Sequence, residues 1–232
     1  MCRLAVLIMG VLLAACALPH VPSRIVYEDS TNFVRLELDE EVLQTQPGSR
    51  HSHPLILPVE QVSNILRGLA IREHRIWIQQ TISGSAPIES VFSDHEISLM
   101  APRLAQALAK ANADERVTFY LSHPQTSIKR EITSGGLYVK GNQLHFILGN
   151  HRLLYGIPAY GMVYDRRYPM MPTVPKAFDL YFSPPEAVVK QNPSIWSRLA
   201  GRTKDEIVID LQKVPAYGTA TPLPGATPSP AL

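Results

Sequence analysis

The sequence predicts an α+β domain in which an antiparallel sheet is covered by two main helices. Three observations support this class. Several short runs alternate apolar and polar residues, as half-buried strands do, and turn-forming residues separate them. Two longer runs space their apolar residues as helices do. The helical runs come early and most strand runs come late, which favours segregated α+β over alternating β-α-β units.

The first part of the domain is expected to be a hairpin followed by a helix. Residues 24–28 and 33–38 alternate apolar and polar side chains, and the turn formers of residues 29–32 lie between them. Pro58 then opens a helical pattern that runs to Leu69, because proline suits the first turn of a helix. Residues 71–81 are expected to be extended.

The second helix has a clear beginning. Ser93 and Glu96 form a capping-box pattern, in which each side chain bonds the backbone of the other. Pro102 falls inside the run and predicts a kink, but the apolar stripe keeps its phase, so one kinked helix is expected. The stripe consists of Ile97, Met100, Ala101, Leu104, Leu108 and Ala111.

Period-two patterns dominate after residue 115. Gly141-Asn142 is a strong hairpin turn, and the strands around it are expected to form an antiparallel meander. The predicted strands are residues 117–121, 127–132, 137–140 and 143–148, followed later by 178–182 and 206–211. Two short helices are expected between the last two strands, at residues 184–191 and 193–199.

Composition indicates a single globular domain of about 190 residues, 24–213. Hydrophobic residues make up 45% of the chain and the net charge is only +2, which argues against a nucleic-acid binder. The uncharged, proline-rich residues 214–232 are expected to be a disordered tail. The chain has two cysteines, Cys2 and Cys16. Cleavage before Cys16 would leave no free thiol, which excludes thiol catalysis and a cysteine zinc site; no cofactor or metal is expected.

The N-terminus is typical of an exported protein. An apolar run of ten residues, too short to span a bilayer, follows Arg3 and fits a signal peptide over residues 1–15. The sequence Leu13-Ala14-Ala15-Cys16 resembles the lipobox of bacterial lipoproteins. That resemblance implies a lipid on Cys16, with residues 16–23 as a short linker. Because Ala17 rather than Asp follows the cysteine, it also implies the outer membrane, with the domain facing the periplasm.

Two histidine groups are candidate sites, although common catalytic motifs such as G-x-S-x-G and H-E-x-x-H are absent. His51 and His53 alternate and could share a metal, but the polar loop at residues 46–54 favours exposed, solvated rings. His145 with Asn150 and His151 could form a catalytic site. Ordinary alternation on a half-exposed strand is the favoured explanation of His145, and cross-strand pairing explains the charges expected near it, Glu131, Lys129 and Lys140.

The segment at residues 155–175 is the third candidate. It is rich in tyrosine, methionine and arginine, the residue types enriched at the centres of interfaces. The possible partner-binding residues are Tyr155, Tyr160, Tyr164, Arg166, Arg167 and Tyr168. The alternative is that the segment merely wraps the sheet and covers apolar surface.

Two functions remain open. The first is a non-enzymatic envelope lipoprotein, held at the membrane by its lipid, that binds a protein or an envelope polymer. The second is a lipid-anchored envelope hydrolase that uses His145, His151 and nearby acids. The hydrolase requires one of these histidines within hydrogen-bond reach of a carboxylate in a pocket. The binding module requires exposed aromatic side chains on the 155–175 segment.

Overall fold

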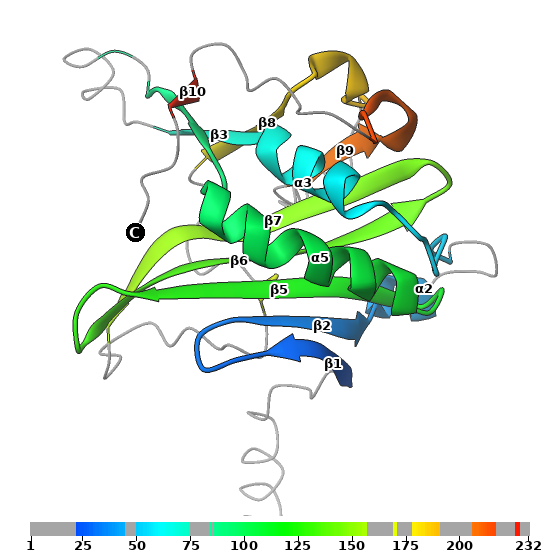
Figure 1. Ribbon diagram of the computed structural model, residues 1–232, viewed down its shortest axis with the longest axis horizontal. Helices are drawn as coiled ribbons and strands as arrows, with labels where there is room; N and C mark the ends of the chain where they lie inside the picture. The colour runs from blue at the N-terminus through cyan, green and yellow to red at the C-terminus, as the bar shows by residue number, and fades with distance from the viewer. Residues whose placement is uncertain are drawn as a thin grey trace, which may run out of the picture.

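The computed structural model describes residues 22–44, 50–74, 84, 86–156, 169–170, 178–190, 206–216 and 226–227. It confirms an α+β fold: a six-stranded antiparallel sheet is covered on one face by helices, and a second, smaller sheet packs beside it (Figure 1). None of the helices in the described ranges has the length and apolar character needed to span a bilayer.

The large sheet has the strand order β1-β2-β5-β6-β7-β9. Its strands are β1 (Ser23–Glu28), β2 (Phe33–Leu38), β5 (Glu115–Pro124), β6 (Lys129–Lys140), β7 (Gln143–Gly156) and β9 (Glu206–Asp210). Each neighbouring pair in this order is antiparallel. The β1–β2 hairpin and the β6–β7 hairpin at Gly141-Asn142 are therefore confirmed.

One strand is longer than its pattern indicates. β6 runs without a break through residues 129–140 and joins the two strands expected at 127–132 and 137–140. Ser134, Gly135 and Gly136 resemble a turn in the sequence, but here they pair with β5 and β7. The glycines are needed because a Cβ on Gly135 would lie 2.2 Å from the carbonyl oxygen of Ile147.

The two predicted helices are α3 (Val59–Gly68) and α5 (Asp94–Lys110), and a short helix, α2, spans Glu40–Gln44. The capping box of Ser93 and Glu96 is present, and α5 continues as one helix through Pro102. The buried faces of α3 and α5 pack on alternate residues of the central strands, such as Val117, Phe119 and Phe146.

The small sheet has the order β10-β4-β3-β8. It consists of β3 (Leu69–Glu73), β4 (Ile88–Ser90), β8 (Phe178–Phe182) and the two-residue β10 (Ala226–Thr227). Of the two short helices expected after β8, only a 3-10 turn, η1 (Pro185–Ala187), lies at the first position. The second, at residues 193–199, falls outside the described residues.

The expected disordered tail is partly ordered. Val214 follows the 3-10 turn η2 (Leu211–Lys213) and is 3% exposed in the core. Ala226 and Thr227 pair in parallel with Ile88 and Glu89. β4 has β3 on only one side, so its other edge can accept this strand. The expectation of disorder is therefore wrong for these residues.

Candidate functional site

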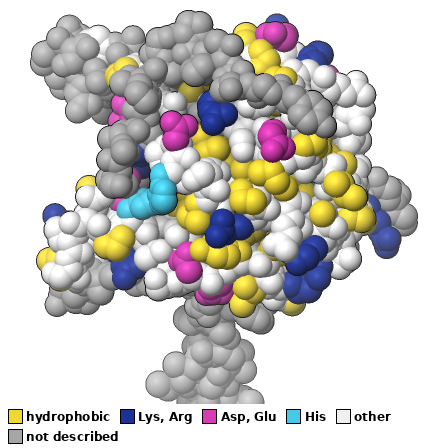
Figure 2. Space-filling view, in the orientation of Figure 1, with side chains coloured by type: hydrophobic (Ala, Val, Ile, Leu, Met, Phe, Trp, Pro, Cys, Tyr) yellow, Lys and Arg dark blue, Asp and Glu magenta, His cyan; other side chains and the backbone are white. Residues whose placement is uncertain are grey.

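Two polar clusters lie toward opposite ends of the large sheet. The near cluster, at the end where β1 begins, consists of Asp39, His51, Tyr138, His145 and Glu206. The far cluster, beyond the first turn of α5, consists of Ser93, Glu96, His123, Glu131 and Arg152. Figure 2 shows hydrophobic side chains across the middle of the helix-covered side and histidine side chains at the margin where α5 begins.

The first candidate pair, His51 and His53, is buried rather than solvated, so that expectation is wrong. The two residues are 4% and 8% exposed. They are buried because their segment crosses the end of β6: the amide of Ser52 donates to the carbonyl of Val139 at 2.7 Å, and the amide of His51 donates to Ala113 at 2.8 Å.

The two histidines differ in their partners. Nε2 of His51 lies 3.0 Å from Oδ2 of Asp39. The other carboxylate oxygen, Oδ1, lies 3.4 Å from the guanidinium of Arg116. Burial alone would raise the pKa of Asp39, but the hydrogen bond from His51 and the charge of Arg116 hold it below its ordinary value. Burial lowers the pKa of His53 to about 4, and the charge of His51 adds to this effect. His53 is therefore neutral at pH 7.

His145 meets a carboxylate, as the hydrolase hypothesis requires, but the pair is buried. Its Nδ1 lies 2.6 Å from Glu206, which also accepts a hydrogen bond from the hydroxyl of Tyr138 at 3.1 Å. The Tyr138 ring is stacked between His145, with centroids 4.6 Å apart, and His51, at 4.4 Å. His145 is only 9% exposed, so the half-exposed strand face was wrongly expected. These contacts pin the start of β9 to β6 and β7, which favours a structural role.

Asn150 and His151 do not join His145. Asn150 pairs with Ser134 and His145 with Tyr138, so about 13 Å of strand separates the two sites. The side-chain amide of Asn150 donates to the Ser134 hydroxyl at 3.0 Å. Burial lowers the pKa of His151 to about 4. The catalytic group expected from these three residues is therefore not assembled.

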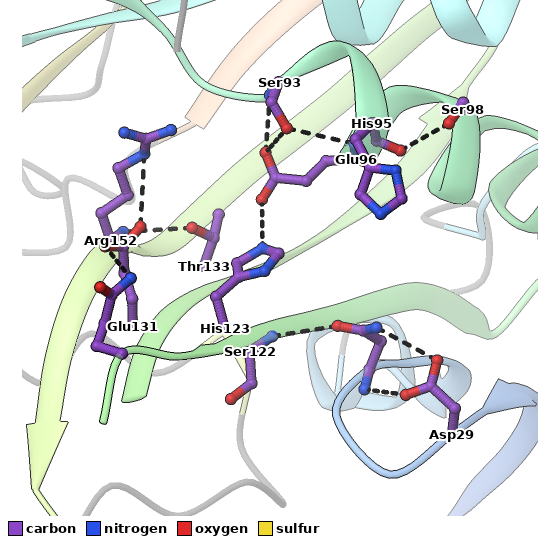
Figure 3. A network of polar contacts seen from close by, with 12 residues as sticks. Asp29, Ser93, His95, Glu96, Ser98, Ser122, His123, Glu131, Thr133 and Arg152 are labelled. Carbon is purple, nitrogen blue, oxygen red and sulfur yellow. Dashed lines mark hydrogen bonds and ion pairs between the residues drawn. The ribbon is translucent and has the colours of Figure 1, made fainter. Parts of the chain in front are cut away.

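In the far cluster, Glu96 lies between Ser93 and His123 (Figure 3). One carboxylate oxygen accepts from the amide and the hydroxyl of Ser93, at 2.7 and 2.8 Å. The other lies 2.9 Å from Nε2 of His123, which projects from β5. Glu96, which completes the capping box of α5 with Ser93, thereby also connects the helix to the sheet.

The contact between Glu96 and His123 favours the charged form of both side chains. Burial opposes ionisation of Glu96, yet the hydrogen bonds from His123 and Ser93 lower its pKa. The hydrogen bond to Glu96 raises the pKa of His123, and burial only partly offsets this. When both side chains are charged, their charges offset each other at the surface.

A β-bulge in β7 positions Arg152. Ile132 pairs with Leu153 and Ser134 with Asn150, so two residues of β7 lie opposite one residue of β6. Arg152 has a φ of 46°, the one positive φ of a residue other than glycine in the described ranges. Its amide donates to the Thr133 hydroxyl at 3.3 Å. Bulges and left-handed residues of this kind cluster at functional sites because they re-aim side chains.

The neighbouring β1–β2 turn is fixed in place. Asp29 accepts hydrogen bonds from the amides of Thr31 and Asn32, at 2.7 and 2.6 Å. The side-chain oxygen of Asn32 accepts in turn from the amide of Ser122 on β5, at 3.2 Å (Figure 3). The strand ends around the far cluster are therefore joined into a rigid surface.

Beyond the far cluster, two aliphatic side chains are exposed. The ends of β5, β6 and β7 project past the beginning of α5, so none of the described helices lies over this part of the sheet (Figure 1). Leu154 on β7 is 64% exposed, and Ile128, in the turn between β5 and β6, is 58% exposed. We call Ile128, Lys129, Glu131, Arg152 and Leu154 the uncovered strip.

The predicted partner-binding residues fall mostly outside the described residues. This holds for Tyr160, Tyr164, Arg166, Arg167, Tyr168, the side chain of Tyr155, and Cys16. Pro169 and Met170 are described, and they lie against the sheet: a Cβ on Gly136 would be 2.6 Å from the Met170 sulfur. At these two residues the segment covers the sheet face opposite the helices.

The sequence does not reveal that the residues of the far cluster come together. The capping box was visible, but nothing in the pattern brings His123 to Glu96 or gives Arg152 its conformation. Within the described residues no group of three or more potential ligands could hold a metal ion. Searches of family models, curated proteins and solved structures gave no match to this chain.

Proposed function

We propose that this protein is a lipid-anchored lipoprotein of the bacterial envelope, held in the outer membrane through Cys16, whose domain binds a protein partner in the periplasm. The uncovered strip is the binding surface. The observation that carries this proposal is the exposure of Leu154 and Ile128, 64% and 58%, on adjacent strand ends. Exposed apolar surface rimmed by polar residues marks interaction sites.

The position of the strip agrees with such a role. β7 ends at Gly156, so the strip leads directly into the tyrosine-rich segment that the sequence marks for partner binding. A non-enzymatic role fits the contacts of the histidines: His145 is buried against the ring of Tyr138, and Nε2 of His123 is engaged by Glu96 at 2.9 Å. The hydrolase alternative would need one of these groups free to act on a substrate.

Placing a photo-crosslinking amino acid at residue 128 or 154 should give a covalent adduct in intact cells. Ile56 is the matched control, because it is aliphatic, 85% exposed and located in the segment before α3. Adducts detected by gel shift and mass spectrometry should come from positions 128 and 154 and be absent at 56. Equal adducts at all three positions, or none at 128 and 154, would contradict the proposal.

Cys16→Ser should abolish incorporation of labelled fatty acid and release the protein from membranes, since a diacylated cysteine is the anchor. The matched control is Cys2→Ser, which lies in the predicted signal peptide and should leave labelling and membrane fractionation unchanged. Labelling that persists in Cys16→Ser would eliminate the lipid anchor.

A further inference from the structure

We propose that Arg152 is the anion-binding group of the uncovered strip, and that the partner it fits is an extended acidic peptide segment with aliphatic side chains. This inference rests on the proposed binding function and names the chemistry of the partner. It follows from the free hydrogen-bond donors of Arg152, the charges around it and the spacing of its neighbours.

Arg152 has hydrogen-bond donors that no other described residue engages. In the described ranges its side chain makes one ion pair, from Nε to a carboxylate oxygen of Glu131 at 3.7 Å. Its two terminal nitrogens form no hydrogen bond within those ranges, and Figure 3 shows them pointing away from Glu131. The side chain is 20% exposed, so it is held by its surroundings yet reaches solvent. A planar guanidinium with two free nitrogens matches the two oxygens of a carboxylate.

The surrounding charges favour an acidic partner. Glu96 is engaged by Nε2 of His123, at 2.9 Å, and by Ser93. Glu131 is shared by Arg152 and by the side-chain amide of Gln125, at 3.4 Å. Lys129 is exposed two residues from Glu131, on the same face of β6. The uncovered strip therefore has two cationic side chains, Arg152 and Lys129, and one carboxylate, Glu131, which already has Arg152 and Gln125 as partners.

The spacing of the strip matches an extended chain. Arg152 and Leu154 are two residues apart on β7, about 6.6 Å along a strand. Despite the bulge they share a face, because Arg152 contacts Glu131, whose partner across the strands is Leu154. An extended peptide lying along β7 has the same repeat. It could place a carboxylate on Arg152 and an aliphatic side chain, two residues on, against Leu154.

The place of the strip in the sheet favours a peptide over the protein's own membrane. Through the strand pairings, the beginning of β1 at Ser23 is level with Tyr138 on β6. Glu131 lies seven residues farther along β6, about 23 Å away. Cys16 precedes Ser23 by only seven residues. The tether therefore enters at the opposite end of the sheet from the strip.

The test measures fluorescence anisotropy of a labelled, capped peptide of alternating leucine and glutamate with the full chain carrying Cys16→Ser. We expect binding that weakens about tenfold in Arg152→Gln, because one charge-assisted contact is lost. It should be unchanged in Arg50→Gln, an exposed arginine outside the strip. The same peptide with glutamine in place of glutamate should bind about as weakly to the unmodified strip as the acidic peptide binds to Arg152→Gln.

Arg152→Gly is the second variant, because glycine adopts a positive φ without strain and so keeps the bulge. It should lose peptide binding to the same extent while remaining folded. Equal binding by all variants would overturn the inference, as would Arg152-dependent binding to phosphatidylglycerol vesicles without peptide binding. Adducts at residue 154 without Arg152-dependent peptide binding would leave the proposed function standing and reject this inference alone. If neither the adducts at residue 154 nor the Arg152-dependent peptide binding were found, the proposed function and this inference would both be rejected.

Discussion

Gly135→Ala should lower the free energy of unfolding by about 3 kcal/mol, the upper end of what is expected when a well-packed interior must move to admit an atom. A Cβ at this position would lie 2.2 Å from the carbonyl oxygen of Ile147 and 3.0 Å from the ring of Phe119. The carbonyl belongs to the adjacent strand and cannot rotate away without breaking the pairing of β6 with β7. Urea unfolding followed by circular dichroism measures the loss.

Gly156→Ala is the matched control, since the nearest atom to its Cβ would be the Ile128 carbonyl oxygen at 3.9 Å, an ordinary contact. Its stability should stay within about 0.5 kcal/mol of the parent, as for other surface changes. If Gly135→Ala were as stable as Gly156→Ala, the close approach of β6 and β7 would be contradicted.

Acidification from about pH 7.5 to about pH 4.5 should cost about 2–3 kcal/mol of stability through His53 alone. The folded pKa of His53 is about 4 against an ordinary value of 6.5. Between about pH 4 and pH 6.5 the imidazole of His53 therefore binds a proton in the unfolded chain but not in the folded chain. The contribution is fully present above pH 6.5 and is lost as the pH falls toward 4. His151, with a folded pKa also of about 4, acts in the same direction.

The variant that isolates this effect is His53→Gln. Glutamine cannot ionise, and its side-chain oxygen can accept the hydrogen bond that the Val139 amide now donates to Nε2 of His53, at 3.4 Å. Between the two pH values His53→Gln should lose about 2 kcal/mol less stability than the parent. His123 is the internal contrast, because its pKa is raised and its contribution is lost on going to higher pH. An unchanged pH slope in His53→Gln would show that His53 is not held neutral by burial.

The elements that the sequence predicted well are those whose signals are local. The capping box of Ser93 and Glu96, the helical stripe of α5 and the Gly141-Asn142 turn each depend on residues a few positions apart. The break expected inside β6 was wrong because two adjacent glycines resemble a turn when read alone. Their purpose is close packing against β7, a contact that no local pattern reveals.

The candidate site was harder to predict because it is built from distant parts of the chain. His51 looked solvated in a polar loop, yet Asp39, Tyr138 and the end of β6 enclose it. His123 gains its partner from the first turn of α5, 27 positions away. Arg152 has its conformation because two residues of β7 lie opposite one residue of β6 at the bulge. Such contacts depend on the register of the strands, and alternation of side chains does not determine register.

By itself the sequence determined that the domain is α+β, where α3 and α5 lie, and that Cys16 sits in a lipobox-like motif. Local propensity, side-chain periodicity and short-range hydrogen bonds suffice for these features. The tertiary structure alone decided which histidines are buried, which strand ends lack a helix over them and which way Arg152 points. The physical reason is that burial and charge pairing depend on which strands become neighbours, and that follows from the packing of the whole chain.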